Sequence, residues 1–148
     1  MLKIETISKG QTQKFAKELA QRITREKLAK QAKIILLRGD LGAGKTTFTQ
    51  GFLRGLGVKS KITSPTFVIS KTYNLKSKTY TKVYHIDAYR IKNPKEILDL
   101  GWKEIISNPG NIVLIEWPER ISKIISGNYI RIILKHGKKE NIRTLQIK

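Results

Sequence analysis

Eight consecutive residues in the first third of the chain have the types and the spacing that cradle phosphate groups. They match the pattern G-x-x-x-x-G-K-[ST] and run Gly39-Asp40-Leu41-Gly42-Ala43-Gly44-Lys45-Thr46. Because glycine has no Cβ atom, such a loop curls tightly and aims successive backbone N–H groups at phosphate oxygens. The pattern predicts that the Lys45 ammonium reaches the β- and γ-phosphates of a nucleotide and that the Thr46 hydroxyl binds Mg²⁺. In the empty loop, we expect the Lys45 side chain to face solvent.

The segments on either side of this loop have the patterns of the elements that must position it. Residues 34–37 are a short run of isoleucine and leucine, which is typical of a strand buried on both faces. Phe48, Phe52 and Leu56 then recur every four residues, which predicts a helix that begins near Gly44. The N-terminus of that helix adds unpaired N–H groups and a partial positive charge to the loop. The alternative is a glycine-rich turn followed by a surface lysine. Such a turn requires neither a buried strand before it nor a helix after it, so the predicted strand and helix favour nucleotide binding.

Two carboxylates at predicted strand ends are candidates to hold the metal ion of such a site. Glu116 directly follows the apolar run at residues 112–115, and Asp87 ends another predicted strand. P-loop enzymes need a carboxylate at the end of a neighbouring buried strand, where it holds Mg²⁺ directly or through water. The alternatives are an ordinary charged residue for Glu116 and a structural cap for Asp87. His85 is expected to be packed or hydrogen-bonded rather than catalytic.

A hydroxyl-rich segment around Pro65 is the candidate nucleotide switch. Thr66 lies between the predicted helix that follows the loop and the next predicted strand, so its hydroxyl would sense the γ-phosphate. The alternative is a Ser/Thr pair that stabilises a turn around the proline.

The remaining pattern predicts helices and strands separated by Gly and Pro. Ser8 and Thr12 are candidate N-caps of a first helix, and Asn93 with Pro94 starts a later helix that Gly101 interrupts. Alternating β-branched and aromatic residues predict a hairpin and a C-terminal strand pair, at Val68–Tyr73 with Thr79–Ile86 and at Tyr129–Leu134 with Ile142–Ile147. We therefore expect an α/β fold, a P-loop NTPase-like three-layer sandwich of parallel core strands with antiparallel additions and a β-hairpin.

Length and composition limit the classes of protein to which the chain can belong. The chain has 148 residues, so we expect one domain over residues 1–148. It has no cysteine, which excludes disulfides, cysteine metal sites and a thiol nucleophile. No apolar run approaches the roughly 20 residues that span a bilayer, and the N-terminal residues lack the apolar stretch of a signal peptide. We expect a cytoplasmic protein without a membrane partner.

The charge of the chain is unusual, because 30 Lys and Arg residues stand against 11 Asp and Glu, a formal net charge of +19. One interpretation is attraction to a polyanion such as tRNA. The other is compositional bias, since Lys and Ile are both abundant and AT-rich coding favours both. The basic residues are spread along the whole chain with few aromatics among them, so we expect only weak, non-specific binding of nucleic acid.

Four ordered blocks together resemble the bacterial TsaE family, a P-loop ATPase of tRNA threonylcarbamoyladenosine (t6A) synthesis. The resemblance covers nearly the whole chain, and the four blocks in this order and spacing are specific where the first alone is not. They are Gly39-Asp40-Leu41-Gly42-Ala43-Gly44-Lys45-Thr46-Thr47, Ser64-Pro65-Thr66-Phe67, His85-Ile86-Asp87-Ala88-Tyr89-Arg90 and Ile115-Glu116-Trp117-Pro118-Glu119. One departure is Ala88, where the family more often has leucine.

The resemblance implies a set of ligands and site residues. ATP would be held by the loop up to Thr47, with Mg²⁺ near Thr46, Asp87 and Glu116. The segment that contains Thr66 resembles the family's switch loop, and Thr12 matches a position near its adenine site. Lys45, Thr66, Asp87 and Glu116 would thus serve ATP hydrolysis.

The resemblance also implies partners. The family acts with the TsaD and TsaB proteins to modify adenosine 37 of tRNA, and TsaE does not itself transfer the carbamoyl group. It hydrolyses ATP while docked on the TsaD–TsaB pair, so its relation to tRNA is indirect.

Two other function classes compete with an accessory ATPase. A small-molecule or nucleotide kinase of this superfamily usually needs an arginine-bearing lid, and the chain has no Arg-rich insertion. An RNA-binding module would carry a recognition motif such as an RRM or KH signature, which the chain lacks. The accessory ATPase alone accounts for all four blocks.

Overall fold

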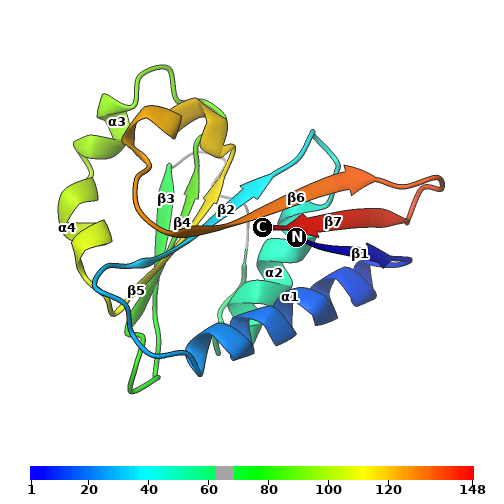
Figure 1. The fold of residues 1–148 in the computed structure, drawn as a ribbon, viewed down its shortest axis with the longest axis horizontal. Helices are drawn as coiled ribbons and strands as arrows, with labels where there is room; N and C mark the ends of the chain where they lie inside the picture. The colour runs from blue at the N-terminus through cyan, green and yellow to red at the C-terminus, as the bar shows by residue number, and fades with distance from the viewer. Residues whose placement is uncertain (63–68) are drawn as a thin grey trace. The chain divides into compact units, whose positions relative to one another are not determined.

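A computed structural model describes residues 1–62 and 69–148 of the chain, and Figure 1 labels its helices and strands. The backbone forms two compact units. The first unit comprises residues 1–26, 38–64 and 131–148, and the second comprises residues 27–37 and 65–130. The expectation of one domain over residues 1–148 stays a prediction.

The first unit contains an antiparallel sheet. Its described strands follow the order β1 (Leu2–Thr6), β7 (Arg143–Ile147) and β6 (Tyr129–His136). Thr144 at the middle strand lies opposite Glu5 on one side and Lys135 on the other. The antiparallel C-terminal pair predicted from alternating residues is therefore confirmed, with β6 two residues longer than expected.

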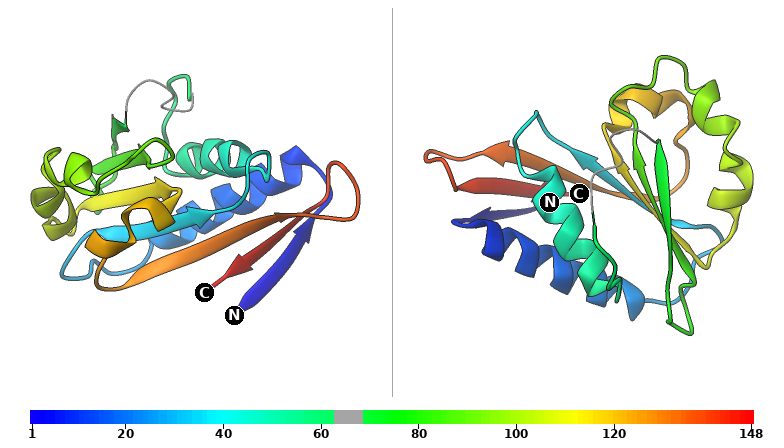
Figure 2. Two further views of the ribbon diagram at one scale, coloured as in Figure 1. Left: turned by 90° about the horizontal axis from the view of Figure 1, so that it is seen from above. Right: turned by 180° about the vertical axis from the view of Figure 1, so that it is seen from behind.

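Two helices of the first unit pack closely against each other. α1 (Lys9–Thr24) and α2 (Lys45–Gly55) lie side by side in all the ribbon views (Figures 1 and 2). A Cβ atom at Gly51 would stand 2.3 Å from the Gln13 carbonyl oxygen, and one at Gly55 would stand 2.5 Å from another α1 carbonyl oxygen. The two glycines therefore permit this close approach of the helix backbones.

The second unit contains the parallel core. Its described strands follow the order β2 (Lys33–Arg38), β5 (Asn111–Glu116), β4 (Lys82–Asp87) and β3 (Ser70–Asn74). The β2–β5 and β5–β4 pairs are parallel, and β3 with β4 forms the predicted antiparallel hairpin. Every residue of β5 is buried, as the continuous apolar run at residues 112–115 predicts.

Short helical segments complete the second unit. They are α3 (Lys95–Leu98), α4 (Trp102–Ser107) and the 3₁₀ helix η1 (Pro118–Ile124). Trp102 and Ile97 pack with strand residues in one hydrophobic cluster. The Glu96 carboxylate accepts hydrogen bonds from the backbone N–H groups of Asn93 and Lys92, and these bonds lower the pKa of Glu96.

The predicted helix starts have mixed outcomes. Ser8 is the N-cap of α1 and accepts a hydrogen bond from the Gln11 N–H at 3.1 Å. Thr12 as an N-cap is wrong, because it lies inside α1 and its own N–H bonds to the Ser8 carbonyl. The helix expected from Asn93 begins at Lys95, and Gly101 interrupts it as predicted. β1 and η1 were not predicted.

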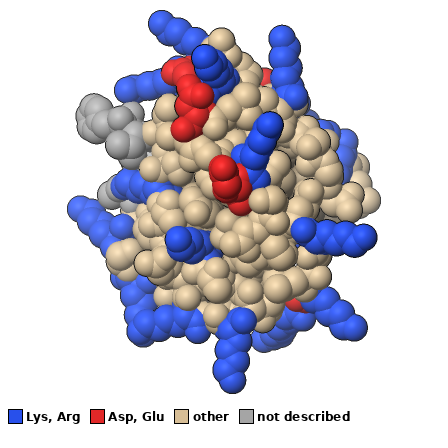
Figure 3. Space-filling view, turned by 90° about the vertical axis from the view of Figure 1, so that its left-hand side faces the viewer, with Lys and Arg blue, Asp and Glu red and all other residues tan. Residues whose placement is uncertain are grey.

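Figure 3 shows how the basic side chains are distributed over one face of the molecule. On the face drawn in Figure 3, Lys and Arg side chains project separately, with a few acidic side chains among them. Among the described residues, no helix is long and apolar enough to cross a membrane.

Candidate functional site

The glycine loop connects β2 to α2 and places its last residues at a helix start. α2 begins at Lys45, and its N-cap residue Gly44 has φ 104°. Gly42 has φ 76°, so two loop glycines occupy backbone conformations that other residues rarely adopt. The turn is closed by a hydrogen bond from the Ala43 N–H to the Asp40 carbonyl at 3.0 Å. The helix begins near Gly44, as predicted.

Lys45 is buried, and the expectation that its side chain faces solvent is wrong. Only 6% of the residue is exposed. Its Nζ atom donates hydrogen bonds to the carbonyl oxygen of Gly39 and, at 2.9 Å, to that of Asp40. An ammonium group has three donors and no acceptor, so it turns inward to the carbonyl groups that its own loop supplies.

Strands β6 and β7 of the first unit support the loop from one side. A Cβ atom at Gly39 would stand 2.8 Å from the Leu134 carbonyl oxygen, so only glycine allows this approach. The Arg143 guanidinium donates a hydrogen bond to the Gly42 carbonyl at 3.2 Å. Sequence reasoning missed this support, because Arg143 and Gly42 are 101 positions apart and neither segment carries a local signal for the contact.

Several residues of the loop are open to solvent. Thr46, the predicted Mg²⁺ ligand, is exposed at the first turn of α2, and Thr47 beside it is half-buried. Leu41 is 67% exposed although it is apolar. The loop therefore presents a hydroxyl group and the first N–H groups of a helix, which together suit an anionic ligand.

Asp87 and Glu116, the predicted acidic pair, lie together in the second unit. They end the parallel strands β4 and β5, where Asp87 is paired with Glu116 in the strand register. The Ala88 N–H donates a hydrogen bond to the Glu116 carbonyl at 3.0 Å, which holds the two strand ends together. Leu37, two residues before Gly39 in the sequence, also pairs with Glu116.

The Glu116 side chain is buried against a histidine. Glu116 is 3% exposed and His85 is 1% exposed. The Nε2 atom of His85 lies 2.6 Å from the Oε2 atom of Glu116. His85 is thus hydrogen-bonded, as expected, while its other ring nitrogen, Nδ1, is buried and has no hydrogen-bond partner. Sequence reasoning did not foresee that Glu116 is the partner.

The backbone turns sharply after Glu116. Trp117 has φ 58°, a left-handed conformation that is costly for a bulky residue. Its ring packs against the Tyr89 ring, with the two ring centroids 4.9 Å apart. The Arg120 guanidinium lies 5.8 Å from the Tyr89 ring centroid. Trp117 is half-buried.

The other predicted site residues are Asp87, whose backbone position is given above, Thr12 and Thr66. The Asp87 Oδ1 atom accepts a hydrogen bond from the Tyr89 N–H at 3.0 Å, which is the local cap considered as its alternative role. Thr12 is 2% exposed, and its hydroxyl lies 2.7 Å from the Thr6 hydroxyl. Thr66 falls within residues 63–68, outside the described part of the chain.

The chemistry of the predicted metal ligands fits Mg²⁺. Thr46 offers a hydroxyl oxygen, and Asp87 and Glu116 offer carboxylate oxygens, which are the hard ligands that this ion prefers. The described residues contain no group of three or more His, Cys, Asp or Glu that would bind a metal unaided. Nucleotide-linked Mg²⁺ is usually held by one or two protein oxygens together with phosphates, so the donor set suits that kind of site.

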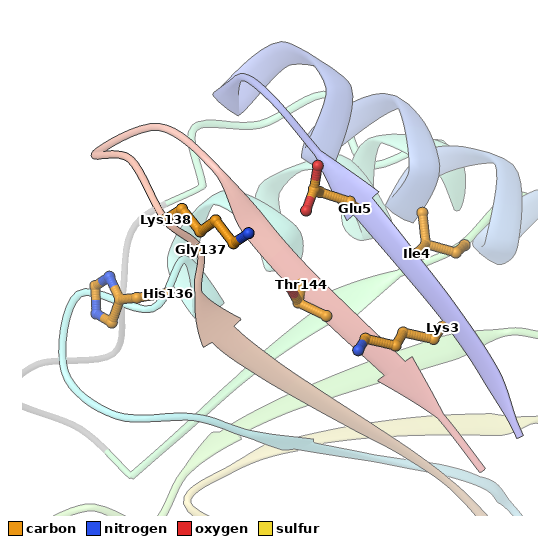
Figure 4. Close-up of a pocket in the computed structure, with 7 residues that line it drawn as sticks. All are labelled: Lys3, Ile4, Glu5, His136, Gly137, Lys138 and Thr144. Atoms are coloured by element: carbon orange, nitrogen blue, oxygen red, sulfur yellow. The ribbon is translucent and has the colours of Figure 1, made fainter.

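A separate pocket of about 610 Å³ lies in the first unit (Figure 4). Its lining comes from β1, the end of β6, the turn that follows it and β7, and includes Lys3, Glu5, His136, Lys138 and Thr144. None of the predicted site residues lines this pocket.

Comparisons with known proteins agree with the architecture. YdiB from Bacillus subtilis, a solved crystal structure, is similar with a TM-score of 0.71 and 31% sequence identity, and the match covers 99% of this chain and 83% of that one. The chain has a P-loop NTPase-like α/β fold, so the fold class expected from the sequence is confirmed.

Sequence comparisons identify the family. TsaE of Rickettsia conorii is 41% identical over 129 residues, which are 86% of this chain and 67% of that protein. TsaE of Bacillus subtilis is 38% identical over 136 residues, which are 92% and 78% of the two chains. The sequence model of the family described as threonylcarbamoyl adenosine biosynthesis protein TsaE matches residues 6–145. With its glycine loop and paired strand-end carboxylates, the chain belongs to the TsaE family.

Proposed function

We propose that this chain is an Mg²⁺-dependent ATPase of the cytoplasm that serves the t6A modification of tRNA together with TsaD and TsaB. The single observation that carries the proposal is the glycine loop at the start of α2, with the Lys45 ammonium held inside it. Membership of a family named for threonylcarbamoyl adenosine biosynthesis gives the biological setting.

The loop residues would bind the phosphates of ATP. The Lys45 ammonium already donates to two loop carbonyl groups, and a phosphate oxygen would compete for the same donors with a full negative charge. Backbone N–H groups of residues 45–47 would add further donors, since the first N–H groups of a helix have no partner within it. When ATP binds, the Lys45 ammonium would exchange these loop carbonyl acceptors for phosphate oxygens.

Thr46, Asp87 and Glu116 would hold Mg²⁺. The ion, when bound, would neutralise negative charge that develops on the transferred phosphoryl group. The support for this assignment is the register of the strands, which sets Asp87 beside Glu116 and Glu116 beside Leu37, just ahead of the loop in the sequence. Thr66, in the segment outside the description, is proposed as the switch hydroxyl that responds to the γ-phosphate.

The partners would perform the transfer itself. ATP hydrolysis by this chain, docked on the TsaD–TsaB pair, would reset that complex between turnovers. Contact with tRNA would then be indirect, as the scattered basic side chains on the face drawn in Figure 3 suggest.

One assay series tests the proposal. ATP turnover is measured for the chain alone, then with TsaD and TsaB, then with tRNA, each with Mg²⁺ and with EDTA. We expect Mg²⁺-dependent phosphate release that rises when the partners are added and that is lost in Lys45→Ala. Phosphate transfer to a small acceptor without the partners would instead identify a kinase. No turnover in any mixture would refute the ATPase assignment.

A further inference from the structure

We infer that His85 is a positioning residue, which holds the carboxylate of Glu116 in the orientation that Mg²⁺-dependent ATP turnover requires. The inference rests on the proposed function and adds a residue to it. His85 is almost completely buried and its Nε2 atom faces the Glu116 carboxylate, so it would act through Glu116 and not on the nucleotide.

The contact between the two side chains is close and shielded from water. Nε2 of His85 and Oε2 of Glu116 are 2.6 Å apart, and both residues are almost completely buried. A hydrogen bond to a charged group is stronger in such an environment than in water, because the local dielectric constant is low. The second carboxylate oxygen, Oε1, takes no part in this contact.

The partners of the imidazole ring decide which nitrogen carries its proton. Nδ1 is buried and has no hydrogen-bond partner, whereas Nε2 faces the carboxylate. A proton on Nδ1 would be a buried donor without an acceptor, which is costly. A proton on Nε2 avoids this cost and is donated to Glu116. The structure therefore favours Nε2 as the donor nitrogen of His85.

This bond restricts how the carboxylate can rotate. Glu116 has three side-chain torsions, and burial alone does not select one orientation of its two oxygens. A donor fixed on the neighbouring strand holds Oε2, so Oε1 is the oxygen that would serve as the metal ligand. Outer partners of this kind typically change metal affinity or activity by about 10- to 100-fold when they are removed.

Two substitutions at His85 separate the hydrogen bond from the packing. His85→Gln keeps an N–H donor at a similar reach, and His85→Phe keeps a ring of similar size without the donor. Val83→Ala is the matched control, because Val83 is equally buried on the same strand and pairs with Ile112, away from Glu116. A double variant that combines His85→Phe with Glu116→Ala tests whether His85 acts through Glu116.

The first readout is the dependence of ATP turnover on Mg²⁺ concentration. We expect His85→Phe to lower turnover at saturating nucleotide by about tenfold or more and to raise the Mg²⁺ concentration needed for half-maximal turnover. His85→Gln should recover most of the loss. Affinity for ADP in EDTA, measured by calorimetry, should change less than threefold in all His85 variants.

The second readout does not depend on activity. The ¹⁵N resonances of the His85 ring distinguish a protonated from an unprotonated nitrogen, and the chain has two histidines, so His136→Gln assigns the signals. We expect the proton on Nε2, and we expect Glu116→Ala to shift that resonance.

The outcomes are distinct. Equal losses in His85→Phe, His85→Gln and Val83→Ala would show a purely structural role and overturn the inference. So would wild-type Mg²⁺ dependence in a folded His85→Phe, or a further loss on adding His85→Phe to Glu116→Ala. Absence of Mg²⁺-dependent turnover in the wild type, with the ¹⁵N result intact, would mean that the proposed function itself has failed, and the inference would fall with it.

Discussion

The Lys45 ammonium donates a hydrogen bond to the Asp40 carbonyl at 2.9 Å, so the cation of the phosphate-binding loop is anchored to the loop's own backbone. The contact links the first residue of α2 to the start of the turn that precedes it. The same side chain would therefore stabilise the empty loop and bind phosphate when nucleotide arrives. Substitutions at this position should affect both properties.

Lys45→Ala should abolish productive ATP binding and should also loosen the loop. Each charge-assisted hydrogen bond that is lost contributes about 1.5–3 kcal/mol. ATP affinity by calorimetry tests the first effect, and amide hydrogen exchange across residues 39–44 tests the second. Lys59→Ala, an exposed lysine of the same unit, is the control. A folded Lys45→Ala that binds and hydrolyses ATP like the wild type would contradict the assignment of the loop.

Gly51→Ala should destabilise the chain far more than Gly57→Ala. A methyl group at Gly51 would meet the backbone of α1 at 2.3 Å, and overpacking of this kind costs about 1–3 kcal/mol or more. Gly57 has φ 89° with nothing within 4 Å of the added carbon, so only backbone strain of about 1–2 kcal/mol is expected. Urea unfolding of the two variants measures the difference. Equal costs would mean that α1 and α2 do not pack as described.

Glu116→Ala and Asp87→Ala should lose Mg²⁺-dependent turnover more than they lose nucleotide affinity. Both carboxylates are proposed to act through the metal, whereas the loop would hold the phosphates. Glu116→Ala also leaves the His85 Nε2–H group buried without its partner, which should cost about 1–3 kcal/mol of stability. Asp87 is less buried, so its variant should be the more stable of the two. If either variant hydrolyses ATP like the wild type in the presence of partners, that residue has no metal role.

The loop and the strand-end carboxylates could be predicted because local sequence determines them. We can recognise a glycine pattern, an apolar run and the residue that follows it without knowing which distant segments contact them. The inward turn of Lys45 and the bond between His85 and Glu116 could not be predicted in this way. Both depend on which acceptors and donors the folded chain brings within reach, and His85 and Glu116 are 31 positions apart.

The missed elements have a similar explanation. β1 carries exposed Leu2 and Lys3 beside a half-buried Ile4, so its pattern is too weak to indicate a strand, and pairing with β7 decides its conformation. η1 begins at Pro118, directly after the left-handed turn at Trp117, and a positive φ at a tryptophan has no sequence signal.

Glu96 should titrate below the ordinary glutamate pKa of 4.5, because its ionised carboxylate accepts hydrogen bonds from the Asn93 and Lys92 N–H groups. A lowered pKa means that this carboxylate stabilises the folded chain above pH 4.5 and that the contribution disappears as pH falls through the lower, folded value. The Glu96 side-chain carboxyl resonance followed by NMR gives the midpoint directly. The glutamate carboxyl resonances of the urea-unfolded chain are the reference. A Glu96 midpoint at or above that of an unfolded glutamate would contradict the prediction.

Removing the exposed lysines Lys76, Lys78, Lys138 and Lys139 should barely change tRNA modification. Lys76 and Lys78 lie on the β3–β4 loop and Lys138 and Lys139 on the β6–β7 loop, and basic side chains on the face drawn in Figure 3 are scattered rather than gathered in one patch. If the net charge of +19 reflects composition, the isolated chain will bind tRNA weakly and without sequence preference.

A salt series distinguishes this outcome from a dedicated RNA surface. Each phosphate contact contributes about 0.7–0.9 to the slope of log affinity against log salt concentration, so contacts made by these lysines would give a steep slope that their removal flattens. We expect a slope that the four substitutions, made singly and together, leave nearly unchanged, both for the chain alone and for its complex with TsaD and TsaB. A slope that falls by about one for each lysine removed, together with lost modification of tRNA, would show that the charge is functional. The indirect relation to tRNA in the proposed function would then have to be replaced by direct contact.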